Sequence, residues 1–144
     1  MALANVLLVD DEVPFVETMV KRLSRRDLHV LTAHGGQEAL DLLDRTPNVD
    51  VVVLDVKMPG MDGIETLKQI KNHFPLVEVI MLTGHGTVES AIDGMKLGAF
   101  DFLMKPAEFD NLVEKVAQAE KVKRDREEKI REAEAKAVFY RMGA

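Results

Sequence analysis

Short apolar runs alternate with segments of helical spacing along most of the chain. The runs at 6–9 (VLLV) and 51–54 (VVVL) are apolar at every position, and further apolar-rich runs occupy 28–33, 77–82 and 100–104. A strand that is buried on both faces has this pattern, whereas a strand with one solvent face alternates apolar and polar residues. The five runs are therefore predicted to be strands of a sheet that is covered on both faces.

Each predicted strand is followed by a segment with the periodicity of an amphipathic helix. In the first of these, Phe15, Met19 and Leu23 recur every four residues, which places them on one face of a helix over 13–24. Later segments of this kind cover 36–44, 64–73, 87–97 and 108 onward. Strands that alternate with helices in this way form parallel βαβ units. The predicted fold class is α/β, with an open parallel sheet of five strands.

Polar residues follow four of the five predicted strands directly or end them. They are Asp10 and Asp11 after the first strand, Asp55 after the third, Thr83 after the fourth, and Lys105 with Pro106 after the fifth. The carboxyl ends of parallel strands lie along one edge of an open sheet, and ligands bind in the crevice at that edge. We therefore expect these side chains to converge on one site, although they are far apart in the sequence.

The composition supports one domain and excludes several functions. Hydrophobic residues make up 47% of the 144 residues and charged residues 31%, which is enough to bury a core. The net charge of −6 argues against direct binding to nucleic acids and to anionic membranes, and the absence of cysteine excludes disulfides and thiolate sites. No apolar run approaches the ~20 residues that span a bilayer, and the first residues lack the pattern of a signal peptide. We therefore expect a cytoplasmic protein.

The three carboxylates at this edge indicate a divalent cation, because they would repel one another without it. Carboxylate and carbonyl oxygens without His or Cys favour Mg2+ (or Mn2+). Lys105 supplies a positive charge at the same edge and Thr83 supplies a hydroxyl donor. A carboxylate nucleophile, a metal, a cation and a hydroxyl are the groups that stabilise a phosphoryl group during transfer.

The chain resembles the receiver domains of two-component response regulators, over about residues 3–122. The matching segments are 6–12 (VLLVDDE), 55–63 (DVKMPGMDG), 83–84 (TG) and 98–106 (GAFDFLMKP). Within that family, 83–87 (TGHGT) and 100–103 (FDFL) are most similar to the receivers of sigma-54-dependent activators. The resemblance implies the flavodoxin-like (βα)5 fold with strand order 2-1-3-4-5.

The resemblance also implies a phosphoacceptor and a metal site. Asp55 would accept a phosphoryl group from the phosphohistidine of a histidine kinase or of a histidine phosphotransfer protein. Mg2+ would be held by Asp10, Asp11, Asp55 and the backbone carbonyl of Lys57. The product would be an acyl phosphate on Asp55.

Other residues would bind the phosphoryl group and transmit its arrival. Lys105, Thr83 and the backbone N–H of Gly84 would contact its oxygens, and the Lys105–Pro106 peptide bond would be cis. Thr83 would move toward the phosphoryl group, and the ring of Phe102 would turn into the space that Thr83 leaves. This shift would change the surface formed by the fourth helix, the fifth strand and the fifth helix, which would contact an unknown downstream protein.

Taken alone, each residue has an ordinary structural explanation. The Asp10-Asp11 pair could cap the following helix, Thr83 could be a common strand-end residue, and Phe102 could pack on the surface. His85 and Lys57 are expected at the rim, where the resemblance allows them to modulate the lifetime of the acyl phosphate. The joint occurrence of the strand-end motifs favours the phosphorylation site.

Two other functions remain open from the sequence. A receiver-like module that binds partners without phosphorylation typically loses an acid or the lysine of the site, and this chain retains all of them. A Mg2+-dependent phosphatase with Asp55 as nucleophile usually needs a second acid two residues later, where this chain has Lys57. We expect a switch with intrinsic phosphotransfer and slow self-dephosphorylation, and no turnover of an external substrate.

The last part of the chain differs in composition. Residues 120–136 are mostly Glu, Lys, Arg, Asp and Ala, with acid-first pairs four residues apart such as Glu120 with Arg124. We expect a receiver domain over 1–122 and a charged helical extension over 123–144. A heptad pattern at 112, 116, 119, 130, 133, 137 and 140 is compatible with a dimerising coiled coil, but Lys123 and Arg126 interrupt its seam. A solvated linker helix is an equal alternative, and a homodimer could also use the surface of the fourth helix, fifth strand and fifth helix.

Overall fold

Five strands alternate with five helices in the computed structural model, which describes residues 2–143; Met1 and Ala144, the ends of the predicted domain and extension, lie outside the described residues. The strands are β1 (Ala4–Val9), β2 (Leu28–Ala33), β3 (Val51–Leu54), β4 (Glu78–Thr83) and β5 (Asp101–Met104). The helices are α1 (Val13–Ser24), α2 (Gly36–Arg45), α3 (Gly63–His73), α4 (Val88–Lys96) and α5 (Phe109–Arg141). Every predicted strand and helix is present.

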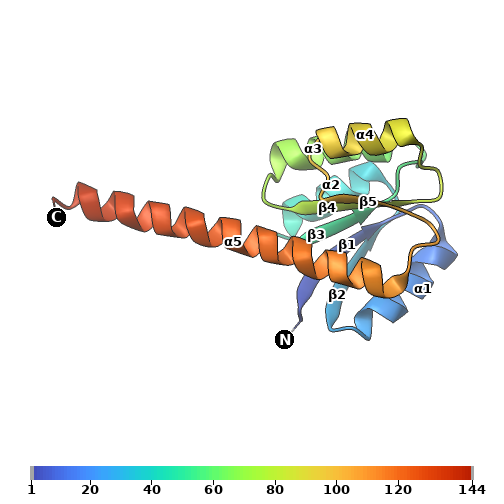
Figure 1. The fold of residues 1–144 in the computed structure, drawn as a ribbon, viewed down its shortest axis with the longest axis horizontal. Coiled ribbons are helices and arrows are strands. Elements are labelled where there is room, and N and C mark those ends of the chain that lie inside the picture. The colour runs from blue at the N-terminus through green and yellow to red at the C-terminus, as the bar shows by residue number, and fades with distance from the viewer. Residues whose placement is uncertain (1, 144) are drawn as a thin grey trace.

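The strands form one parallel sheet in the order β2-β1-β3-β4-β5 (Figure 1). The predicted fold class and the strand order implied by the resemblance are therefore confirmed. Strand ends differ slightly from the sequence prediction. β1 begins at Ala4, because Ala4 already pairs with Leu28 of β2, and β4 includes Thr83, which pairs with Met104 of β5.

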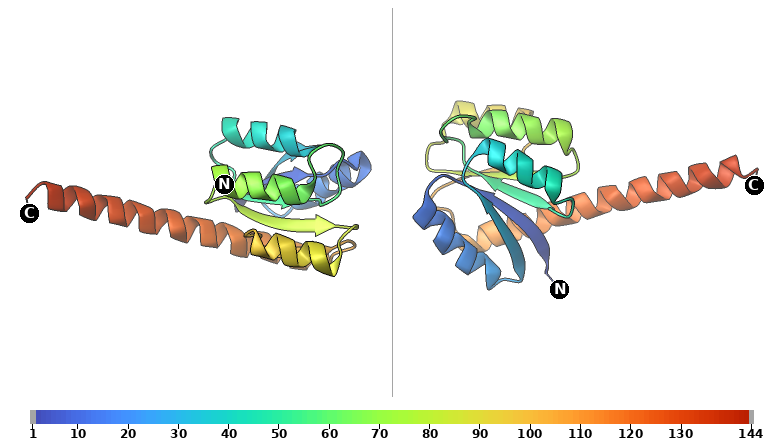
Figure 2. Two further views of the ribbon diagram at one scale, coloured as in Figure 1. Left: turned by 90° about the horizontal axis from the view of Figure 1, so that it is seen from above. Right: turned by 180° about the vertical axis from the view of Figure 1, so that it is seen from behind.

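Helices cover both faces of the sheet (Figure 2). Neighbouring residues of β1 point to opposite faces: Leu8 packs with α1 and α5, while Leu7 packs with α2 and α3. Both residues are fully buried, which explains why β1 reads as a continuous apolar run. By contrast, Gly94 is the one buried residue of the described helix α4, which leaves Val88 and Ile92 exposed.

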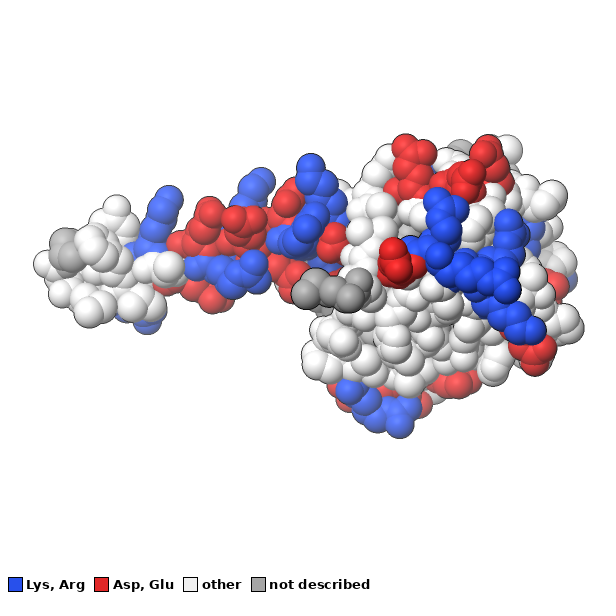
Figure 3. All heavy atoms as spheres, turned by 90° about the horizontal axis from the view of Figure 1, so that it is seen from below, with Lys and Arg blue, Asp and Glu red and all other residues white. Residues whose placement is uncertain are grey.

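Helix α5 has 33 residues and extends past the domain as a rod (Figure 1). At a rise of 1.5 Å per residue, its length is about 50 Å. Its first turns bury Leu112, Val113, Val116 and Ala119 against the sheet. Acidic and basic side chains are interspersed over the middle of the rod (Figure 3). Among residues 2–143, no helix is long and apolar enough to cross a membrane.

Candidate functional site

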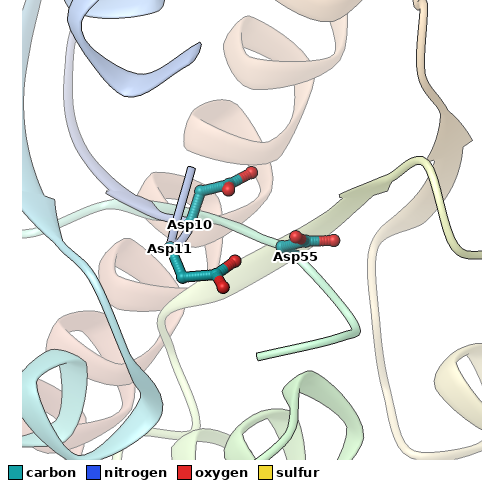
Figure 4. A group of neighbouring side chains, drawn as sticks. All are labelled: Asp10, Asp11 and Asp55. Atoms are coloured by element: carbon teal, nitrogen blue, oxygen red, sulfur yellow. The ribbon is translucent and has the colours of Figure 1, made fainter. Parts of the chain in front are cut away.

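Three carboxylates converge at the carboxyl edge of the sheet (Figure 4). Asp10 and Asp11 follow β1, Asp55 follows β3, and these two strands are neighbours that pair Val9 with Leu54. One carboxylate oxygen of each residue lies within 4.8 Å of the other two. Asp10 and Asp55 are buried, whereas Asp11 lies closer to the solvent.

Both carboxylate oxygens of Asp10 accept hydrogen bonds. Oδ1 accepts from the backbone N–H of Glu12 over 2.9 Å, and Oδ2 accepts from Nζ of Lys105 over 2.7 Å. Burial raises the pKa of Asp10, and the charge of Asp55 adds to this effect, while the bonds from Lys105 and Glu12 oppose it. The net result is a pKa above the ordinary value, because burial and the charge of Asp55 disfavour the ionised carboxylate more than its hydrogen bonds stabilise it.

Asp55 has one satisfied oxygen and one free oxygen. Its Oδ1 accepts from the backbone N–H of Val56 over 2.8 Å. Its Oδ2 is buried and has no hydrogen-bond partner among the described residues. Buried polar atoms without partners are rare, and they often mark a place for an ion or a reacting group. The three neighbouring carboxylates together are a donor set that fits Mg2+.

The loop after Asp55 is fixed by glycine and by a helix cap. The N–H of Gly63 donates to the carbonyl of Val56 over 2.6 Å, and a methyl group on Gly63 would collide with the carbonyl oxygen of Asp55. Asp62 caps α3, since its Oδ1 accepts from the N–H of Glu65 over 2.9 Å. Gly60 has a positive φ of 74°, which glycine adopts at little cost. The backbone of Asp55 is therefore held from the side of α3.

Lys105 points at Asp10. Its Nζ lies 2.7 Å from Asp10 Oδ2, 3.5 Å from Glu12 Oε1 and 3.8 Å from the ring centroid of Phe15. The sequence placed Lys105 at this edge as a positive charge, and the structure pairs its amine with Asp10, the acid next to Asp55. Burial lowers the pKa of Lys105, but the hydrogen bond and charge of Asp10, with Asp55 and Glu12, raise it above its ordinary value. The Lys105–Pro106 peptide bond is cis.

Thr83 lies at the same edge, at the end of β4. It is fully buried, and its Oγ1 accepts from the backbone N–H of His85 over 3.0 Å. The carbonyl of Thr83 accepts from the N–H of Lys105 over 2.9 Å, which ties the ends of β4 and β5 together. Gly84 follows beside the stem of Lys105, with ordinary room for a methyl group.

The ring of Phe102 is half-buried between the β4–α4 loop and α4. A methyl group on Gly86 would collide with the ring, and one on Gly94 would touch it. Phe102 therefore packs against the segment that follows Thr83. A hollow at the mouth of the site is lined by Lys57 and His85, together with Asp11, Glu12, Met58 and Pro59.

Two residues of the site were not singled out by the sequence. Glu12 and Phe15 both contact the amine of Lys105. Phe15 belongs to the apolar stripe of the first helix, so its spacing indicated only a core position. Glu12 follows the Asp10-Asp11 pair directly, and this adjacency was the one available signal.

Comparisons with known proteins agree with this geometry. The family model of the response regulator receiver domain matches residues 6–117. The transcriptional regulatory protein ZraR of Escherichia coli K12 is 39% identical over 108 residues, which is 75% of this chain and 24% of ZraR. The DNA-binding transcriptional regulator NtrC of Klebsiella pneumoniae is 38% identical over 112 residues, 78% of this chain and 24% of NtrC. The chain thus spans about a quarter of the length of these curated relatives.

A solved structure has the same fold. The response regulator receiver domain protein from Clostridium thermocellum superposes with a TM-score of 0.80 at 36% identity, covering 84% of this chain and 97% of that one. ZraR and NtrC are regulators of transcription by name. This agrees with the resemblance to the receivers of transcriptional activators.

Proposed function

The chain belongs to the response regulator receiver domain family, and on that premise we propose that it is a switch in which Asp55 accepts a phosphoryl group. As a receiver of two-component systems, it would take this group from a histidine kinase or from a histidine phosphotransfer protein. A cytoplasmic location is part of the proposal, in keeping with the acidic, cysteine-free composition.

The observation that carries the proposal is the free Oδ2 of Asp55. It is a buried oxygen without a hydrogen-bond partner among residues 2–143, whereas both oxygens of Asp10 are engaged. A nucleophile needs a lone pair that is not already used. Of the two buried carboxylates, Asp55 therefore fits the role of phosphoacceptor.

The chemistry requires one bond to form and one to break. Oδ2 of Asp55 attacks phosphorus, the phosphorus–nitrogen bond of the phosphohistidine breaks, and its electron pair remains on the imidazole nitrogen. Asp10, Asp11, Asp55 and the backbone carbonyl of Lys57 would hold Mg2+. When bound, the cation supplies positive charge that offsets the carboxylates and the phosphoryl oxygens.

The remaining site residues would bind the product. Lys105 is already at the rim of the acid cluster, so a small movement of its amine would bring it to a phosphoryl oxygen. The hydroxyl of Thr83 and the N–H of Gly84 would donate to other oxygens. Oγ1 of Thr83 accepts one backbone hydrogen bond, so its own hydroxyl hydrogen remains available to donate to a phosphoryl oxygen.

The proposed switch couples Thr83 to Phe102. The ring packs on the segment that begins just after Thr83, so a movement of Thr83 would change the packing around Phe102. The neighbouring surface of α4 and β5 exposes Val88, Ile92 and Met104, and α4 is held by few buried side chains. A change at Phe102 would therefore reshape the surface of α4, β5 and α5 that meets a downstream protein.

The lifetime of the acyl phosphate is proposed to depend on Lys57 and His85. Both line the hollow beside Asp11 at the mouth of the site, where they could affect the access of water to the acyl phosphate. The protein would hydrolyse its own acyl phosphate slowly, and it would not turn over an external phosphate ester. Repeated turnover of a small phosphate ester would instead support a phosphatase.

For the whole chain, we propose a receiver over 1–122 and an extension over 123–144 that serves as a linker or dimerisation helix. A homodimer would use either the α4, β5 and α5 surface or the rod. Light scattering with and without beryllofluoride, a phosphoryl mimic, would detect assembly that depends on the active state.

The proposal is tested by intact mass after incubation with acetyl phosphate and Mg2+. The expected result is one added phosphoryl group on the wild type and none on Asp55→Asn. No added mass on a wild-type protein that binds Mg2+ would point to a partner-binding module that works without phosphorylation. Stoichiometric phosphorylation of Asp55→Asn would contradict the assignment of the acceptor.

A further inference from the structure

Two acidic residues lie side by side at the edge of the sheet opposite to Asp55. Asp50 directly precedes β3, and Glu78 is the first residue of β4. The N–H of Glu78 donates to the carbonyl of Asp50 over 3.2 Å, so the two backbones touch. Glu78 is only 3% exposed. A carboxylate this deeply buried is unfavourable unless it is paired, so its partners decide what it does.

The shortest contacts to cations come from helix α5, while Nζ of Lys71 on α3 lies farther away, at 3.9 Å from Oε1 of Glu78. Nζ of Lys123 donates to Oδ1 of Asp50 over 3.1 Å, and Nη1 of Arg126 donates to Oε1 of Glu78 over 2.7 Å. The other oxygen of Asp50, Oδ2, accepts from the backbone N–H of Asn5 over 2.8 Å. We call Asp50, Glu78, Lys123 and Arg126 the base clamp.

Lys123 is an unusual residue for a charged helical extension. It is 7% exposed, and it is the last buried residue among those described in α5. Burial lowers the pKa of its amine, but the hydrogen bonds and charges of Asp50 and Glu127 raise it above the ordinary value. Lys123 is therefore charged at neutral pH and held between two carboxylates.

The base clamp continues the stripe with which α5 contacts the domain. The buried residues Val116 and Ala119 are followed by Lys123 and Arg126 at steps of four and three, so all four lie on one face of the helix. Apolar packing ends at Ala119, and ionic contacts hold the next two turns. The two charges that interrupt the heptad seam are thus the ones that face the domain.

We propose that the base clamp fixes the direction in which α5 leaves the receiver, so that the rod and the sheet move as one body. Glu78 and Lys123 are buried, although the side chain of Arg126 is 55% exposed. An ion pair with a buried member has a narrow range of favourable geometries, so it specifies an orientation better than sliding apolar contacts do. Asp50 directly precedes β3 and Glu78 begins β4, and the other ends of these two strands lead to Asp55 and Thr83. The rod is therefore attached to the same two strands that hold the phosphorylation site.

The direction of the rod can be measured as a distance between two spin labels. The chain has no cysteine, so labels can be placed at Asn72→Cys on α3 and Lys136→Cys on the rod, both at exposed positions. Spin-labelled protein is diluted with unlabelled protein, so that pairs between copies do not contribute. With the clamp intact, we expect one narrow distance distribution.

The test variant is Lys123→Met/Arg126→Met, which keeps the apolar stems and removes both cations. We expect the narrow distribution to be lost and a broad one to replace it. The matched control is Lys121→Met/Arg124→Met, which removes the same charge from exposed positions of the same turns and should stay narrow. A distribution as narrow in the test variant as in the wild type would overturn the proposal.

The variant Lys123→Met/Arg126→Met leaves acids unpaired and could unfold for that reason, so a second variant is needed. Glu78→Gln/Arg126→Met removes the acid together with its partner, and circular dichroism checks that it folds. The same loss of the narrow distribution is expected, and an unchanged distribution in a folded protein again contradicts the clamp. All samples lack Mg2+ and phosphoryl donor, so the outcome does not depend on the proposed phosphorylation of Asp55.

Discussion

At the scale of single residues, the two buried carboxylates of the site differ in their hydrogen bonds. Asp10 is fully engaged by Lys105 and Glu12, whereas Asp55 keeps one oxygen free. This difference supports the proposal that Asp55 is the phosphoacceptor and that Asp10 is a metal ligand paired with Lys105. Sequence reasoning predicted both acids, because they follow continuous apolar strands, but it could not distinguish their partners. The partners are Lys105 from the segment after β5 and the backbone N–H groups of Glu12 and Val56, whose directions depend on how the loops fold.

The raised pKa of Asp10 predicts a pH dependence of folding in metal-free buffer. The folded-state pKa of Asp10 lies above the free side chain's value of 3.8. The stability that Asp10 contributes is therefore fully present below pH 3.8 and is lost as the pH rises through the folded-state pKa. Lys105 stays charged in this range, since its pKa is also raised. Urea unfolding of the wild type and of Asp10→Asn, compared at several pH values above 3.8, should show the wild type losing stability relative to the variant. Parallel pH curves for the two proteins would contradict this prediction.

Phe15 gives a second prediction at the residue scale. Its ring face lies 3.8 Å from Nζ of Lys105, close enough for a cation–π interaction that helps to hold the amine beside the acids. Phe15→Leu keeps an apolar side chain but loses the ring, so phosphorylation by acetyl phosphate should slow by about 3- to 10-fold. Phe15→Tyr keeps the ring and should remain near the wild-type rate. Equal rates for the Leu and Tyr variants would mean that Phe15 only packs.

At the scale of elements, the loop between β3 and α3 is the most tightly constrained part of the site. Gly63 begins α3 directly against the backbone of Asp55. Gly63→Ala should destabilise the fold by about 1–3 kcal/mol, because the added methyl group forces the Asp55 backbone aside. It should also slow phosphorylation. Thermal unfolding and the acetyl phosphate rate, measured on the same sample, check both effects.

Gly35 supplies the control for this substitution. It is also a glycine at the start of a helix, but nothing lies within 4 Å of where its methyl group would be. Gly35→Ala should lose at most about 1 kcal/mol as a weaker N-cap and should phosphorylate normally. If both alanine variants behaved alike, the close approach of Gly63 to Asp55 would not matter for the site.

The strands were predictable from sequence because each is buried on both faces, and the periodicity of α1 was equally clear. The role of Lys123 and Arg126 was not. In a segment rich in both charges, buried ion pairs look the same as solvated ones, and their partners Asp50 and Glu78 lie 73 and 48 residues away. Only the register of α5 on the sheet shows which charges of the helix face the domain.

At the scale of the whole molecule, the receiver and the rod are joined by contacts that reach past residue 122. A chain shortened to 1–122 lacks Lys123 and Arg126, whereas one shortened to 1–127 retains them. The shorter chain should be less stable by about 1–3 kcal/mol, because Glu78 and Asp50 lose these two cations. The loss stays within this range because Arg126 is partly exposed, which weakens its ion pair. Urea unfolding of the two chains measures the difference. Equal stabilities would place the end of the domain at 122.

Chemical trapping tests whether Asp55 alone accepts the phosphoryl group. After incubation with acetyl phosphate and Mg2+, borohydride reduces an aspartyl phosphate to homoserine, and peptide mass mapping locates the altered residue. We expect homoserine at position 55 alone, and none when Mg2+ is chelated. Homoserine at position 10 or 11, or an unmodified position 55 in a protein that has gained a phosphoryl group, would contradict it.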